Sequence, residues 1–99
     1  VIGGDRKSDL KILEAIREMG GTVFHPVGTC RMGSDTGSVV DPQLRVRGVQ
    51  GLRVIDASIM PKITSANTNA ATLMVGEKGA SMILKETNRR NSILAEEIL

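Results

Sequence analysis

The sequence predicts an α/β fold, and three patterns in the chain predict it. Apolar residues recur at helical spacing over residues 9–19, and residues 44–47 alternate apolar with basic side chains, as in a strand with one solvent-facing side. An apolar run at 52–55 ends in Asp56 and precedes a second helical pattern over residues 70–85. With 40% hydrophobic and 24% charged residues, the 99-residue chain has the composition of a folded domain rather than a disordered segment.

The first helix is expected to follow a flexible lead-in at residues 1–7. Ser8 can cap its N-terminus, and Asp9 places a negative charge in the first turn, where the helix dipole favours it. The pair Gly20-Gly21 is expected to end the helix, one of the two with a left-handed backbone. One face of this helix carries Ile12, Leu13, Ile16 and Met19.

Three short strands and one short extended piece, at residues 39–40, are expected between the two helices. Apolar and β-branched residues favour extended structure there, and turns rich in glycine separate the segments. The last strand is expected to be buried, with Asp56 at its carboxyl end. The four segments are residues 22–24, 39–40, 44–47 and 52–56.

The second helix is expected to begin after the cap-forming residues 67–69 and to run to about residue 85. Residues 88–91 are polar, and residues 92–99 could form a separate short helix. One apolar face of the long helix is expected to carry Ala71, Met74, Val75 and Met82. An adjacent face, narrow enough for close packing, is expected to carry Gly76, Gly79, Ala80 and Ile83.

Composition excludes several classes of partner. A net charge of +2 with scattered basic residues argues against nucleic acid, and no apolar run reaches membrane-spanning length. The single cysteine can form no internal disulfide, which favours a cytoplasmic or membrane-peripheral location over secretion. Phe24 is the only aromatic residue, so something outside the chain is expected to complete its core. A piece of a longer protein would explain this and the missing initiator methionine.

The segment HPVGTCRMG at residues 25–33 holds the most reactive candidates. A lone histidine is more often structural or exposed than catalytic. His25, however, ends an apolar segment just before a turn, where ligand-facing residues are common, and imidazole can take a proton near neutral pH. Cys30 is better explained as a packing residue than as a nucleophile. One cysteine and one histidine cannot complete a zinc site.

The strand end at Asp56 and the helix start at 67–69 form a second candidate site. In doubly wound sheets, cofactors bind at the carboxyl ends of strands, and helix N-termini receive anionic or electron-rich groups. Taken alone, these residues are more often simple turn and helix caps. The sequence contains no glycine-rich phosphate-binding motif.

Four motifs in the same order resemble the C-terminal part of the GMC (glucose-methanol-choline) flavin oxidoreductases, most closely the choline dehydrogenase group and related alcohol dehydrogenases. The resemblance runs from about residue 22 to residue 83. It implies an FAD-binding α/β fold, of which this chain supplies the final strand, loop and helix, some short strands and a preceding helix. The motifs are HPVGTCRMG at 25–33, VDPQLRVRG at 40–48, GLRVIDASIMP at 51–61 and NTNAATLMVGEK at 67–78.

The resemblance implies oxidation of a small-molecule alcohol, in which hydride passes to N5 of FAD while a base removes the hydroxyl proton. His25 matches the family's catalytic base, and Asn67 matches the second member of its active-site pair. The chemistry suits these side chains. Neutral imidazole can accept the alcohol proton, and the Asn67 amide can donate a hydrogen bond to the developing alkoxide.

The resemblance also places four residues against FAD. Asp56 and Ala57 match the strand end that contacts the ribityl-diphosphate portion, and Thr68 and Asn69 match the helix start near the pyrimidine end of the isoalloxazine ring. The positive end of that helix would face the flavin where negative charge accumulates. The family's dinucleotide motif belongs near its N-terminus and is absent here. The missing N-terminal part of the fold would therefore supply most of the FAD site.

On this resemblance the chain divides into a lead-in and amphipathic helix, a GMC C-terminal region and a polar C-terminal tail. Ala66 and Ala71 stand where the choline dehydrogenase group is expected to have glycine and proline, and these changes could shift the helix start. Neither the alcohol nor the electron acceptor follows from these residues. The three parts are residues 1–21, 22–86 and 87–99.

Two alternatives keep the same motifs. A hydroxynitrile lyase on this scaffold would retain His25 and FAD without net redox chemistry, and a truncated remnant would act only as a structural module. An assay with an alcohol and an artificial acceptor, set against a cyanohydrin, separates the first alternative from alcohol oxidation. The 99 residues alone are expected to bind FAD weakly or not at all and to show no turnover.

Overall fold

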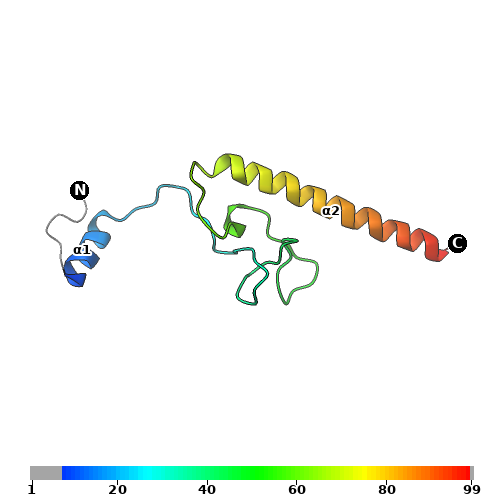
Figure 1. Cartoon of the computed structure of the whole chain (residues 1–99), viewed down its shortest axis with the longest axis horizontal. Helices are drawn as coiled ribbons and strands as arrows, with labels where there is room; N and C mark the ends of the chain where they lie inside the picture. Colours follow the sequence, from blue (N-terminus) through cyan, green and yellow to red (C-terminus); the bar gives the residue numbers. More distant parts are fainter. Residues whose placement is uncertain (1–7, 99) are drawn as a thin grey trace.

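One long helix lies beside a group of loops, and a short helix is set apart at the other end of the chain (Figure 1). The computed structural model describes residues 8–98, and the molecule is elongated, with dimensions of 76 × 27 × 18 Å. The helices are α1 (Asp9–Met19), the 3-10 helix η1 (Ala57–Ile59) and α2 (Asn69–Ile98). None of these helices is long and apolar enough to cross a membrane. The expected lead-in at residues 1–7 lies outside the described residues.

Helix α1 is confirmed, with its predicted N-cap. The Ser8 side chain accepts a hydrogen bond from the Lys11 N–H at 3.4 Å. The predicted left-handed glycine is wrong, because Gly20 has an extended backbone (φ −67°, ψ 137°) and Gly21 has no positive φ either. Gly20 ends the helix because its extended ψ takes the chain out of the helical conformation, and a side chain there would be crowded. A Cβ atom at this position would lie 2.3 Å from the Ile16 carbonyl oxygen, which accepts the Gly20 N–H.

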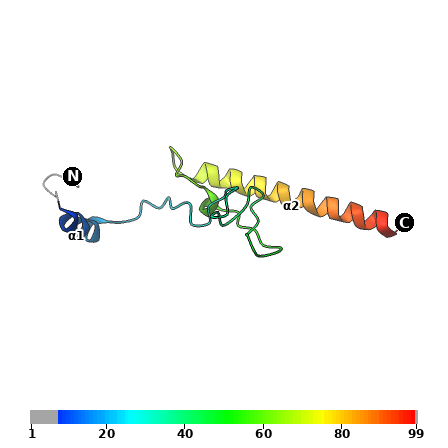
Figure 2. The ribbon, with the colours of Figure 1, turned by 60° about the horizontal axis from the view of Figure 1, so that its bottom comes forward.

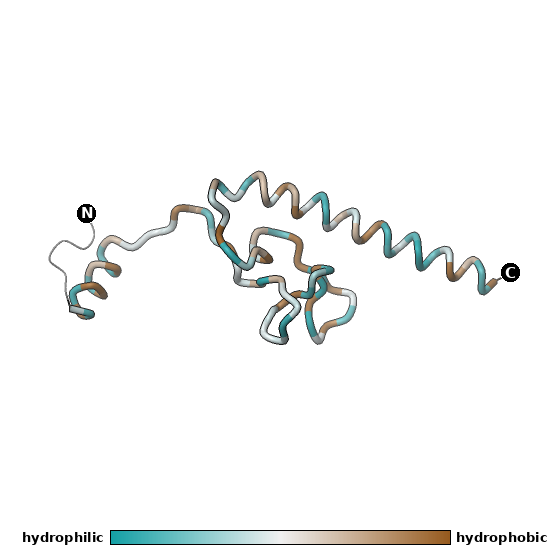
Figure 3. The backbone as a smooth tube through the Cα atoms, viewed as in Figure 1, coloured by the Kyte–Doolittle hydropathy of each residue, from teal (hydrophilic) through white to brown (hydrophobic). Residues whose placement is uncertain are grey.

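The apolar face of α1 has no partner in the described part of the chain. Its apolar side chains are exposed, and only Ala15 is buried. The extended segment after α1 holds the helix away from the loops in both ribbon views (Figures 1 and 2). Figure 3 shows the apolar residues along this isolated helix. This exposure supports the expectation that something outside the chain completes its core. The exposed residues are Leu10, Ile12, Leu13, Ile16 and Met19.

The three predicted strands are wrong for the described residues, which contain isolated β-bridges and no strand, and the predicted extended piece at 39–40 takes part in these bridges through Val40. Phe24 and Leu44 interrupt two of the predicted segments, because both have a φ of 63°, in the left-handed region. Leu52, predicted to be buried, is half exposed. A strand needs a partner along its length, but the later segments are bridged at only one or two positions each, and residues 22–24 are not bridged at all.

The loops are nevertheless joined by short backbone ladders. The Met32 N–H donates to the Ile59 carbonyl at 2.8 Å, which joins the 25–33 segment to η1. The Gly33 N–H donates to Val40 at 3.1 Å. Val40 in turn bridges to Val46, and Arg45 bridges to Arg53. These segments therefore lie side by side in the order 58–59, 30–33, 39–41, 44–47 and 52–54.

A small core lies between these loops and α2. Around it pack partly buried side chains that include Met32, Ile55 and Met82. The predicted alternation at residues 44–47 survives without the strand, because the two apolar side chains point inward and the two arginines are exposed. The buried residues of the core are Val40, Leu44, Ile59, Met60 and Val75.

Helix α2 continues well beyond its predicted end and is a single 30-residue helix. The predicted break at 88–91 is wrong, because residues 86–98 contain no glycine or proline and include several strong helix formers. Of the predicted inner face, Val75 is buried and Met74 is 58% exposed, so Met74 was misplaced. Of the predicted small-residue face, only Gly79 is buried.

Replacing Gly79 with alanine is expected to destabilise the protein. A Cβ atom there would lie 2.4 Å from the Ile55 Cγ2, so the added methyl group must displace that side chain. Overpacking costs about 1–3 kcal/mol, and the gain in helix propensity returns about 1 kcal/mol of it. Gly76→Ala is the matched control, because nothing lies within 4 Å of its Cβ position. Thermal or denaturant unfolding should show Gly79→Ala less stable than Gly76→Ala; equal stability would contradict this packing.

Candidate active site

His25 is held by a hydrogen bond to the start of α2. Its Nδ1 atom lies 3.0 Å from the hydroxyl oxygen of Thr68, 43 residues along the chain, and its side chain is half-buried. The preceding residue, Phe24, turns the chain with its positive φ and is itself 82% exposed. The histidine is therefore fixed by one ring nitrogen, which leaves Nε2 for a reacting group.

Thr68 is itself well anchored. Only 8% of its surface is exposed, and its carbonyl oxygen accepts bonds from the Thr72 N–H at 2.9 Å and the Thr72 hydroxyl at 2.7 Å. A residue fixed by the first turn of a long helix is a rigid support for a second side chain. The sequence pointed to Thr68 as a flavin contact and gave no sign of its bond to His25.

Asn67 and Asn69 flank Thr68, and both are exposed. Asn69 is the first residue of α2. In the described part of the chain, neither amide forms a side-chain hydrogen bond, so both remain available to an external group. The structure thus brings Asn67 into the neighbourhood of His25 through Thr68, and its role in the active-site pair remains a prediction.

Asp56 caps η1. Its carboxylate accepts the Ser58 N–H at 2.8 Å and the Ser58 hydroxyl, and these two bonds, the hydroxyl first, hold the Asp56 pKa below its ordinary value. The side chain is exposed and ionised at neutral pH, and Ala57 begins the 3-10 turn behind it. Such a carboxylate accepts hydrogen bonds from hydroxyl groups and repels phosphate.

The 25–33 segment lies against η1, so the two candidate sites of the sequence are joined. The Cys30 N–H donates to the Ser58 carbonyl at 3.0 Å, beside the bond from Met32 to Ile59 described above. Gly28 has a φ of +89°, and a Cβ atom there would lie 3.4 Å from the Met60 carbonyl oxygen. These backbone hydrogen bonds therefore join the segment that begins with His25 to the 3-10 helix that Asp56 caps.

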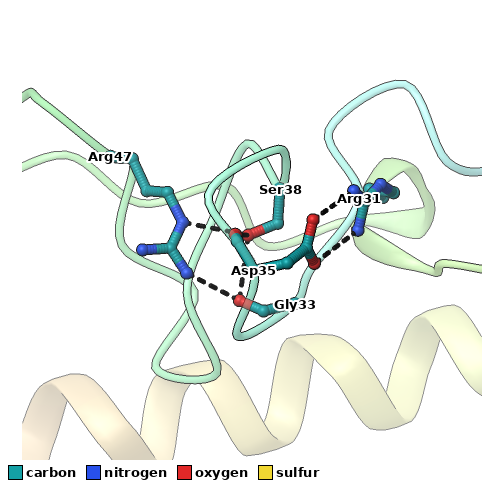
Figure 4. Close-up of polar contacts among 5 residues, drawn as sticks. All are labelled: Arg31, Gly33, Asp35, Ser38 and Arg47. Atoms are coloured by element: carbon teal, nitrogen blue, oxygen red, sulfur yellow. Dashed lines mark hydrogen bonds and ion pairs between the residues drawn. The ribbon is translucent and has the colours of Figure 1, made fainter.

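A second polar cluster, missed from the sequence, stabilises the loop after this segment (Figure 4). Arg31 donates two bonds to the Asp35 carboxylate, at 2.9 and 2.6 Å, and these lower the Asp35 pKa to about 2. The pair contributes stability above the ordinary pKa of aspartate and loses it as the pH falls toward 2. Both groups are exposed, so the contribution is small. The spacing of four residues between Arg31 and Asp35 was the one feature of the sequence that could have indicated this ion pair.

Arg47 closes the other side of the same loop. Its Nε donates to the Ser38 hydroxyl at 2.9 Å, and its Nη2 donates to the Gly33 carbonyl at 2.8 Å. The buried Ser38 hydroxyl also donates toward the carbonyls of Gly33 and Asp35. A Cβ atom at Gly33 would lie 2.6 Å from the Asp35 carboxylate, so a larger residue there would displace that carboxylate. The cluster holds loop 31–47 in shape and is structural.

His25, held at the start of α2 near the exposed amides of Asn67 and Asn69, is a candidate for proton transfer. The ionised Asp56 is a candidate ligand contact. Comparison with known families matches residues 2–76 to the GMC oxidoreductases. The chain belongs to this family.

Several relatives are similar over most of this chain. The alcohol dehydrogenase [acceptor] of Pseudomonas putida is 52% identical over 82% of the chain, and the oxygen-dependent choline dehydrogenase of Escherichia coli O157:H7 is 53% identical over the same share. Among solved structures, pyridoxine 4-oxidase from Mesorbium loti superposes with a TM-score of 0.60 at 40% identity, over 82% of the chain. The chain spans only 15%, 14% and 16% of these proteins.

Proposed function

We propose that this chain is the C-terminal part of an FAD-dependent enzyme that oxidises alcohols, in which His25 takes the hydroxyl proton as hydride leaves for flavin N5. The observation that carries the proposal is the hydrogen bond between His25 Nδ1 and the Thr68 hydroxyl. Membership of the GMC family and the similarity to alcohol and choline dehydrogenases support it.

His25 acts as the base through Nε2. If its Nδ1–H donates to Thr68 Oγ1, the ring is held in the tautomer whose Nε2 lone pair is free to accept a proton. Thr68 positions the ring, because its own backbone is fixed in the first turn of α2. Asn67, exposed beside Thr68, donates its amide N–H to the developing alkoxide and so stabilises charge at the substrate oxygen.

The residues at the second site fit FAD. The ionised Asp56 would accept hydrogen bonds from the hydroxyl groups of the ribityl chain and would disfavour a phosphate group at the same place. Ala57 has only a methyl side chain, which obstructs a close approach little. The N-terminus of α2, at Thr68 and Asn69, presents the positive end of a 30-residue helix to the flavin ring. When bound, FAD supplies the hydride acceptor that this chain lacks.

The exposed apolar face of α1 also supports the proposal that this chain is part of a larger protein. With five large apolar side chains uncovered on one short helix, the chain needs further protein to bury them. The rest of a GMC fold would cover this face and supply the remaining walls of the FAD and alcohol sites.

The intact polypeptide that contains this chain tests the function directly. Purified with FAD and kept anaerobic, it should lose the visible absorbance of oxidised flavin when an alcohol such as choline is added, and turn over with an artificial electron acceptor. The 99 residues alone should leave the fluorescence of added FAD unchanged. Flavin that no alcohol in a broad panel bleaches, together with cleavage of a cyanohydrin, would contradict alcohol oxidation.

A further inference from the structure

A groove runs between the loops of residues 41–55 and the middle of α2. It has a volume of about 690 Å³, and both ribbon views place these loops along one side of the helix (Figures 1 and 2). None of the six predicted catalytic and cofactor-binding residues lines it. Three arginines from three different segments do line it: Arg45, Arg53 and Arg90.

The backbone places two of these arginines opposite one another. Arg45 and Arg53 form an antiparallel β-bridge, so their side chains start from directly opposite positions on neighbouring segments. Like charges placed this way repel one another unless an anion lies between them. Glu86 pairs with Arg53 through Nη2, whereas Nη1 of the same guanidinium is buried without a hydrogen-bond partner among the described residues.

The acidic residues of the groove are already engaged. One oxygen of the Asp41 carboxylate accepts the backbone N–H groups of Gln43 and Arg45, at 2.8 and 3.0 Å. Glu86 is paired with Arg53. The groove is therefore lined by three arginines and by two carboxylates that are already engaged. This excess of positive charge along a hollowed surface attracts an added oxyanion.

The groove also has an apolar wall. Val49, Leu52 and Ile83 line it, and each is about half exposed. We propose that the groove binds a small amphiphilic oxyanion, a carboxylate or phosphate group carried on an apolar body. Arg45 and Arg90, both exposed, hold the oxyanion, because guanidinium groups match the geometry of both groups, and the more deeply set Arg53 adds its positive charge nearby. The apolar wall contacts the body.

Binding of octyl phosphate and of octanoate to the intact polypeptide tests this proposal. Calorimetry or a thermal shift at constant ionic strength, with chloride as the balancing salt, should show binding of at least one of the two. Preference for either identifies the anionic group. Inorganic phosphate should bind more weakly than octyl phosphate, because it lacks the apolar body.

Two variants and a matched control complete the experiment. Arg45→Gln and Arg90→Gln each remove one cation and leave the Arg53–Glu86 pair in place, so each should weaken the affinity about tenfold or more. Arg89→Gln removes the same charge from the adjacent residue of α2, which does not line the groove, and should leave the affinity unchanged. Failure of both octyl probes to bind, or equal weakening by all three variants, would overturn the proposal. The readout is binding without turnover, so its failure is distinct from failure of the proposed oxidation.

Discussion

Replacing His25 with alanine should lower turnover of the intact enzyme by about 10²–10⁴-fold, the scale on which a positioned general base contributes. The alcohol proton would then have no acceptor at the site where Thr68 now holds the imidazole. The FAD content should stay the same, because the resemblance gives His25 no part in holding the cofactor. Steady-state kcat and the rate of flavin reduction by alcohol under anaerobic conditions measure the effect.

Two further measurements make this result specific to proton transfer. Added imidazole should restore part of the lost turnover, since a small base can occupy the space left by the side chain. Ser34→Ala, in the exposed loop just after the same motif, is the control and should be unaffected. Normal turnover of the His25→Ala enzyme would remove His25 from its role, and loss of FAD would make its role structural.

The sequence was sufficient to locate the reactive segments and insufficient to show how they meet. His25 stood out as the only histidine before a turn, and residues 67–69 stood out as helix-capping side chains. The hydrogen bond between His25 and Thr68 spans 43 residues, and no local pattern contains it. Likewise, both Gly76 and Gly79 had the small size that close packing needs. Only the folded structure shows that Ile55 packs against Gly79 and that nothing packs against Gly76.

The predicted strands failed for a physical reason. Strand propensity reflects a side chain's fit to a pleated, half-buried surface, so it depends on neighbours. Val23 and Phe24 have that propensity but lie exposed, with no chain beside them, and Phe24 adopts a left-handed backbone instead. The predicted end of α2 failed differently. Thr87 and Asn88 are weak helix formers, yet nothing there breaks the backbone bonding, so the helix continues to Ile98.

Replacing Thr68 with valine should lower kcat by about 10- to 100-fold, the usual cost of removing the group that orients a functional histidine. Valine keeps the shape of threonine and removes only the hydroxyl that meets His25 Nδ1 at 3.0 Å, so the ring loses its fixed orientation. Thr68→Ser keeps a hydroxyl and should retain most of the activity. KM should change less than kcat if this hydroxyl acts through His25, its partner in the structure.

The same variant separates the two roles open to Thr68. If its hydroxyl serves the flavin, as the family resemblance implies, the valine variant should lose FAD while its flavin-loaded fraction turns over normally. If it positions His25, FAD content should persist and kcat should fall. Combining Thr68→Val with His25→Ala then gives the decisive comparison, because residues that act through one another are not additive. The double variant should be no slower than His25→Ala alone, and a further 10- to 100-fold loss would show that Thr68 acts independently of His25.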